Sequence, residues 1–278
     1  MIDRFDAFRC TSCSAAAAAT INKWVAEKTS NKVTEVVSPD DVDASTALVL
    51  VDAVYFKGSW LTKFDNSNTK DEDFHISPKE SVKVKMMHLK AEFNYGINEE
   101  LNCAAVELPY RGKSLSMFIM LPEKGVTSLS EVEKKLTYDD LVNVTEKFAM
   151  APIDIKLWLP RFSLDEKREL GKKLSGLGMK DLFNHGAADL SGIDGSKTLY
   201  VSKILHRAVM EVNEEGTVDA ATTVVDMKAR SIPLQMDFHA NHPFIFFIQD
   251  KATRSILFLG RLVKPSSSSK SSTVLQRP

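Results

Sequence analysis

The pattern of apolar and polar positions predicts a chain of both helices and strands, with strands in the majority. Ile21, Trp24 and Val25 are spaced at i, i+3 and i+4, which predicts the last turns of an amphipathic helix that ends near Asn31. Residues 47–56 form a long apolar run rich in valine, which is typical of a strand buried on both faces.

Two capping boxes predict two further helices. Ser128 with Glu131 precedes one apolar helical pattern, and Ser163 with Glu166 precedes another that begins at Leu170.

The C-terminal half adds more strands. Residues 199–212 alternate and are rich in β-branched side chains, so they predict a long strand. Residues 244–248 and 255–262 predict a hairpin closed by a short polar turn. We therefore expect an α+β protein with large sheets rather than a parallel dinucleotide-binding sheet.

Composition and charge exclude several classes. The 278 residues are 44% hydrophobic and 26% charged with a formal net charge of -1, which indicates a globular chain without a global attraction to nucleic acid or anionic membranes. Three cysteines cannot make a disulfide framework, and no apolar run is long enough for a membrane helix. Residues 1–20 form a biased leader without the features of a secretory signal, and residues 266–278 are a Ser-rich tail that we expect to be disordered.

The sequence contains no motif that is typical of catalysis or of metal binding. The six histidines show no spacing that would place two ligands on one helix face, and no nucleophile elbow, P-loop or dinucleotide fingerprint occurs. We therefore expect a protein that is not an enzyme and that holds no metal and no cofactor.

One segment, residues 214–231, suggests a function. It follows a predicted strand, contains Gly216, and continues with small and β-branched residues that could form a strand in one state and a loop in another. The alternative is an ordinary polar hairpin loop.

The chain resembles the serpins, a family of serine protease inhibitors, and the resemblance covers residues 21–265. Motifs similar to those of the family occur in the family's order at residues 22–29 (NKWVAEKT), 54–60 (VYFKGSW), 108–110 (LPY), 117–122 (MFIMLP), 159–162 (LPRF), 189–193 (DLSGI), 199–217, 242–247 (HPFIFF) and 258–261 (FLGR).

The resemblance implies a reactive loop near residues 214–235, with a reactive bond between Arg230 and Ser231. Arg230 lies 16 residues after Glu214, which equals the hinge-to-bond spacing of inhibitory members. The implied hinge comprises Glu214, Glu215, Gly216, Thr217, Asp219, Ala220 and Ala221, and the implied sheet-opening region comprises Asp52, Trp60 and His206.

The implied mechanism is suicide inhibition. A protease cleaves the reactive bond, the freed loop inserts into the central sheet, and the attached protease is trapped. An arginine at the bond fits a primary pocket with a carboxylate at its base, so the expected partner is a trypsin-like serine protease. Lys228 is an alternative cleavage point that would favour plain proteolysis.

Two local features depart from the family pattern. Val218 and Asp219 replace small residues of the hinge, and Asp219 would carry a carboxylate onto the inward face of an inserted strand. Asp52 stands where the family usually has an asparagine facing the histidine matched by His206. The two could form a charge-assisted pair that makes sheet opening sensitive to pH, or a polar pair that changes nothing.

A third departure concerns the N-terminal part of the family domain, which has no counterpart in this sequence. The expected fold is the multi-sheet serpin fold without its N-terminal helices and part of its central sheet, in a chain that acts as a monomer. Resemblance implies the extracellular space, with the cytoplasm as the alternative compartment. The alternative function is a non-inhibitory or defective serpin fragment that serves as a protease substrate or binding module.

Overall fold

The computed structural model describes residues 14–43, 45–125, 127–215 and 235–265. The chain forms two compact units. The first contains residues 1–56 and 165–210, and the second contains residues 57–164 and 211–278. Each unit is described by itself.

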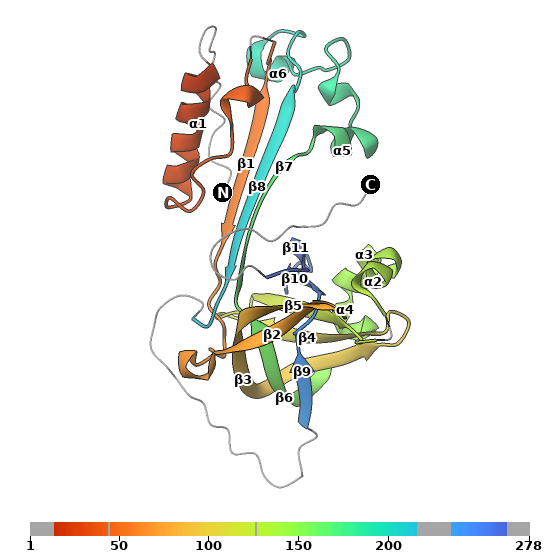
Figure 1. Ribbon diagram of the computed structural model, residues 1–278. Coiled ribbons are helices and arrows are strands. Elements are labelled where there is room, and N and C mark those ends of the chain that lie inside the picture. The colour runs from red at the N-terminus through yellow and green to blue at the C-terminus, as the bar shows by residue number, and fades with distance from the viewer. Residues whose placement is uncertain (1–13, 44, 126, 216–234, 266–278) are drawn as a thin grey trace. The chain divides into compact units, whose positions relative to one another are not determined.

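A three-stranded sheet in the order β1-β8-β7 forms the centre of the first unit (Figure 1). β1 (Val49–Phe56) and β8 (Lys203–Val212) are parallel, and their register runs from Val49 opposite Lys203 to Phe56 opposite Met210. Both strands confirm the strands expected at residues 47–56 and 199–212. The expected burial of the first strand on both faces is wrong, because the residues of β1 are partly exposed and Asp52 is exposed.

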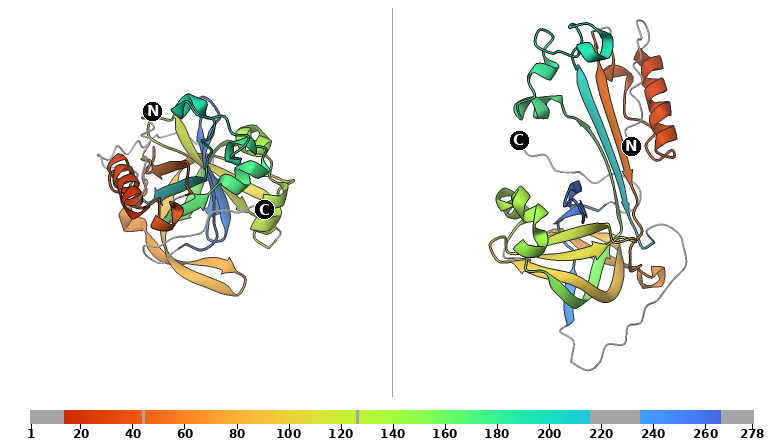
Figure 2. Two further views of the ribbon diagram at one scale, coloured as in Figure 1. Left: turned by 90° about the horizontal axis from the view of Figure 1, so that it is seen from above. Right: turned by 180° about the vertical axis from the view of Figure 1, so that it is seen from behind.

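The helix α1 (Ser14–Lys28) covers this sheet, and Figures 1 and 2 show it alongside β1. Its buried face and the segment after it pack against both strands, through a cluster of Ala18, Val25, Val33, Val36, Val37, Leu205 and Val209. The helix ends close to the position expected near Asn31, and it begins seven residues ahead of Ile21, where sequence analysis placed the start of the family domain.

The helix expected after Ser163 is wrong. Residues in this region form β7 (Phe162–Glu169), and only the short helix α5 (Gly171–Gly176) follows it. Phe162 and Leu164 are buried with a polar position between them, and Asp165 Oδ1 accepts from Arg207 Nε of β8 at 2.7 Å. Pairing with β8 therefore determines that this segment forms a strand and not a helix. The rest of the unit is η1 (Pro39–Asp41), η3 (Asp181–Phe183) and α6 (Ser191–Asp194).

The second unit contains an eight-stranded sheet, with seven strands in the order β11-β10-β5-β4-β3-β6-β9 and β2 paired to β3. Its strands are β2 (Lys70–Ser77), β3 (Glu80–Asn98), β4 (Cys103–Pro109), β5 (Leu115–Pro122), β6 (Ala151–Pro160), β9 (Gln235–His239), β10 (Phe244–Asp250) and β11 (Ile256–Leu262), and η2 (Asn66–Asn68) precedes β2. The antiparallel pairing of β10 with β11 confirms the expected C-terminal hairpin.

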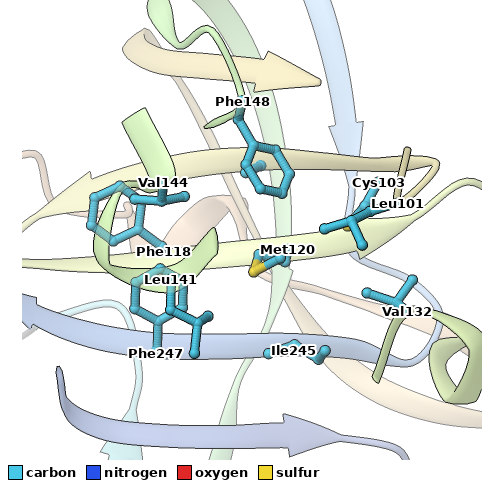
Figure 3. Close-up of a cluster of buried hydrophobic side chains, with 11 residues drawn as sticks. Leu101, Cys103, Phe118, Met120, Val132, Leu141, Val144, Phe148, Ile245 and Phe247 are labelled. Carbon is cyan, nitrogen blue, oxygen red and sulfur yellow. The ribbon is translucent and has the colours of Figure 1, made fainter. Parts of the chain in front are cut away.

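Three short helices cover one face of this sheet: α2 (Leu129–Lys135), α3 (Tyr138–Val142) and α4 (Val144–Lys147). The expected capping box of Ser128 and Glu131 starts α2. Figure 3 shows the core between helices and sheet, which includes Phe118, Phe148 and Phe247.

Candidate functional site

The start of the expected hinge is fixed in the second unit by an ion pair whose carboxylate is buried. Glu214 follows the end of β8, and its side chain is only 2% exposed. Arg161, between β6 and β7, donates from Nε to Glu214 Oε2 at 3.0 Å and from Nη2 to Oε1 at 2.5 Å. The Thr69 hydroxyl donates to Oε1 at 2.6 Å. This two-point geometry holds the carboxylate in one orientation.

The same contacts set the charge state of Glu214. Burial alone raises the pKa of the carboxyl, but the hydrogen bonds from Arg161 and Thr69 outweigh it and lower the pKa below its usual value. Glu214 is therefore ionised at neutral pH, and the chain is tied down immediately before residue 216.

Trp60 fixes the preceding residue. Its indole Nε1 donates to the Asn213 carbonyl at 2.8 Å, and its ring stacks on Tyr110 with centroids 4.6 Å apart. Asn213 Oδ1 in turn accepts from the Glu215 backbone N–H at 3.2 Å. The structure thus brings Trp60 next to Glu214 and Glu215, although sequence analysis placed Trp60 in the sheet-opening region and the two glutamates in the hinge.

The other two residues expected in the sheet-opening region, Asp52 and His206, lie in the first unit. Asp52 of β1 and His206 of β8 are register partners, and Asp52 Oδ2 lies 2.7 Å from His206 Nδ1. The hydrogen bond with His206 lowers the pKa of Asp52. The pair bridges the parallel strands β1 and β8.

The other expected site residues lie outside the described residues. These are Gly216, Thr217, Asp219, Ala220 and Ala221 of the hinge, and Arg230 and Ser231 of the reactive bond.

Two residues of the site, Arg161 and Thr69, were absent from the sequence prediction. Arg161 belongs to the LPRF motif at residues 159–162, but a motif shows neither the direction of its side chain nor the partner 53 residues away. No sequence motif includes Thr69, which is distinguished only by its position before a strand.

The described part of the chain shows no helix long and apolar enough to cross a membrane. Across residues 14–43, 45–125, 127–215 and 235–265, no group of three His, Cys, Asp or Glu side chains is arranged to hold a metal ion. The candidate site residues of the second unit are the anchored carboxylate of Glu214 and Trp60, and those of the first unit are Asp52 and His206.

Comparison with known proteins agrees with this architecture. The sequence matches the family model for serpin (serine protease inhibitor) over residues 5–265, so the chain belongs to the serpin family. Among curated proteins, the leukocyte elastase inhibitor of Xenopus laevis is 44% identical over 248 residues, and that of Homo sapiens is 43% identical over 249 residues, each match covering 88% of this chain.

Solved structures show the same fold. Uncleaved ovalbumin matches with a TM-score of 0.81 at 32% identity, over 92% of this chain and 64% of that chain. Serpin-12 of Manduca sexta matches with a TM-score of 0.79 at 30% identity. The chain spans about 65% of the length of the curated relatives that it matches. It has the multi-sheet serpin fold and covers 64% of the ovalbumin chain.

Proposed function

We propose that this chain inhibits a serine protease by presenting the bond between Arg230 and Ser231 and then inserting the cleaved segment between β1 and β8. The observation that carries this proposal is the anchoring of Glu214 by Arg161, Thr69 and the Trp60-bound neighbour Asn213. A segment that is to become a strand beside β8 needs a fixed turning point where β8 ends.

The order of the strands supports insertion. β1 and β8 are parallel, and a segment that turns back after Glu214 would run antiparallel to both of them. The 16 residues from Glu214 to Arg230 would span roughly 50 Å as a strand, more than enough to pair along all of β8. An exposed segment would exchange water for strand hydrogen bonds, and this exchange is the source of the energy for trapping.

The covalent step follows from serine protease chemistry. The serine Oγ of the protease attacks the carbonyl carbon of Arg230, and its proton passes through the catalytic histidine to the leaving nitrogen of Ser231. The bond between Arg230 and Ser231 breaks, and an ester joins Arg230 to the protease. Insertion before water hydrolyses the ester would leave the protease attached.

The expected partner is a trypsin-like protease, because the guanidinium of Arg230 matches a pocket with a carboxylate at its base. The relatives named leukocyte elastase inhibitors favour an elastase as a second candidate partner, since they are 43 to 44% identical to this chain. The extracellular space is the expected location, with the cytoplasm as the alternative.

The experiment is an incubation of the purified chain with trypsin and, separately, with elastase, followed by denaturing gel electrophoresis. A band at the summed mass of chain and trypsin, together with a released peptide that begins at Ser231, is the expected result. Arg230→Gln should abolish the trypsin complex. Cleavage after Arg230 without any complex would instead favour the non-inhibitory substrate, and a complex with elastase alone would overturn the trypsin-like specificity.

A further inference from the structure

The turn that follows α5 in the first unit holds a leucine in solvent. Leu177 is 83% exposed, the largest exposed fraction among the large apolar side chains of the described residues, and Met179 is 49% exposed. Figures 1 and 2 show α5 and α1 on opposite sides of β1 and β8, so the helix that packs on this sheet does not cover the turn. A single exposed leucine is common on protein surfaces, so its exposure gains meaning only from the surrounding residues.

The backbone of this turn is closed by hydrogen bonds. The N–H of Met179 donates to the Leu174 carbonyl at 3.1 Å, and the N–H of Gly178 donates to the Ser175 carbonyl at 3.1 Å. Gly178 has a φ of +108°. These bonds form a Schellman motif, which favours glycine at the residue with positive φ and an apolar pair at the positions of Leu174 and Met179. The motif makes no demand on the residue before Gly178, so the end of α5 does not explain the exposed leucine.

Three exposed lysines accompany Leu177. Lys172 and Lys173 belong to α5, and Lys180 follows three residues after Leu177. The N–H of Leu177 donates to the Lys173 carbonyl at 3.0 Å, so these two side chains lie on the same side of the helix. Within the described part of the chain, none of the three lysines makes an ion pair or a side-chain hydrogen bond. Their charges are therefore available to a partner.

The carboxylates of this segment compensate the lysines only in part. Glu166 pairs with Arg168, and Glu169 Oε1 accepts from the backbone N–H of the first residue of α5 at 2.7 Å. Asp181, directly after Lys180, remains as an exposed carboxylate. Positive charge therefore exceeds negative charge around the apolar tip, although the whole chain has a formal net charge of -1.

We propose that residues 172–180, the basic turn, bind the surface of a membrane that contains anionic phospholipid. Leu177 and Met179 enter the boundary between headgroups and acyl chains, and the three lysines contact the negatively charged headgroups. The flexible stems of the lysines let their ammonium groups stay at headgroup level while the apolar tip is buried. A soluble polyanion offers no apolar phase for the leucine, so the exposed tip favours a lipid surface. This inference does not depend on the proposed function.

The attraction should be local and sensitive to salt. At physiological ionic strength charges act over about 8 Å, so the lysines at the tip contribute and distant charges of the chain do not. Each lysine close to an anionic surface changes the affinity about fivefold. Because burial of the leucine does not depend on charge, part of the binding should persist at high salt.

The dissociation constant is measured for vesicles of 70% phosphatidylcholine and 30% phosphatidylserine, and for vesicles of phosphatidylcholine alone, in 100 mM NaCl and again in 500 mM NaCl. In 100 mM NaCl, Lys172→Glu combined with Lys173→Glu should weaken binding to the anionic vesicles at least tenfold. Leu177→Ser should weaken it at least threefold in both salt concentrations. Vesicles of phosphatidylcholine alone should bind at least tenfold more weakly than the anionic vesicles.

Matched controls come from exposed residues of the second unit. Lys79→Glu combined with Lys113→Glu makes the same change in net charge, and Ile97→Ser removes an apolar side chain that is 51% exposed. Both controls should bind the anionic vesicles within twofold of the wild type. A loss in the lysine control equal to that in Lys172→Glu with Lys173→Glu would overturn the proposal, because the basic turn would then have no special role.

Two further outcomes would overturn the membrane site. The first is a wild-type chain that does not bind the anionic vesicles. The second is an unchanged vesicle affinity of Leu177→Ser together with heparin binding that the double lysine variant weakens, which would indicate a polysaccharide site. Vesicle binding requires neither a protease nor cleavage, so a chain that traps no protease leaves this test intact.

Discussion

Glu214 shows how a single buried carboxylate can be tolerated at the end of a strand. Its side chain is almost completely covered, and the two-point contact with Arg161 and the hydroxyl of Thr69 occupy both of its oxygens. Loss of Arg161 would leave a desolvated negative charge without a compensating positive charge.

Arg161→Met should therefore destabilise the second unit by about 2 kcal/mol, because it removes two hydrogen bonds to a charged, buried group. Urea unfolding followed by tryptophan fluorescence gives this number. Arg161→Lys keeps the charge and serves as the control, with a smaller loss expected. Equal stability of Arg161→Met and the wild type would show that Glu214 does not depend on Arg161.

Asp52 leads to a prediction about pH. Its pKa is lowered in the folded chain by the hydrogen bond with His206, so the pair stabilises the fold above the usual aspartate pKa of about 3.9 and loses this effect as the pH falls through the lower, folded value. Asp52 is more than half exposed, so the contribution is below about 1 kcal/mol.

Wild type should thus be slightly more stable than Asp52→Asn at pH 6, and the two should converge as the pH falls below the lowered pKa of Asp52. Urea unfolding over a pH series measures the difference. A difference that grows as the pH falls would contradict the assigned pair.

For single residues, the sequence shows which positions deviate from the family pattern, but it does not show which partner a side chain contacts. Trp60, His206 and Glu214 were candidates because they stand within motifs similar to those of the family, and Asp52 was a candidate because it differs from the asparagine expected opposite His206. Arg161 could not, because its role depends on a contact between positions 53 residues apart.

At the scale of elements, β7 explains why the helix expected after Ser163 does not form. Ser163 and Glu166 match a capping box, and Leu170, Leu174 and Leu177 have helical spacing. The residues from Phe162 instead join β8, because the edge of that strand offers hydrogen bonds and Arg207 pairs with Asp165. A local pattern predicts a helix only where no sheet edge competes for the same residues.

The contact between β3 and α4 depends on a residue without a side chain. A Cβ on Gly96 would lie 2.0 Å from the carbonyl oxygen of Phe148, which caps α4. Gly96→Ala should therefore separate the strand from the helix and lower stability by about 3 kcal/mol, as overpacking does. Gly112→Ala is not a suitable control because of its positive φ, whereas Gly176→Ala meets open space and should be nearly neutral. The thermal unfolding midpoints of Gly96→Ala and Gly176→Ala test this prediction.

At the scale of the whole molecule, ordered motifs were enough to predict the family and the general fold. The division into two compact units was not predictable, because it depends on contacts between segments that are far apart in sequence, such as residues 1–56 with 165–210. The chain spans about 65% of its relatives' length, and it matches uncleaved ovalbumin with a TM-score of 0.81.

Asp219 limits how well the whole chain should trap a protease. On an inserted strand its carboxylate would share a face with Thr217 and would be desolvated, which costs several kcal/mol and slows insertion. Asp219→Ala should lower the number of inhibitor molecules consumed per protease trapped, as measured by titration of trypsin activity. An unchanged stoichiometry would remove this explanation.

The most direct test of insertion is the thermal unfolding midpoint of the chain before and after specific cleavage between Arg230 and Ser231. Insertion would add a strand with roughly ten net hydrogen bonds at about 1 kcal/mol each, so the midpoint should rise by roughly 20 °C. A midpoint that stays the same or falls after complete cleavage would contradict insertion between β1 and β8, and with it the proposed trapping mechanism.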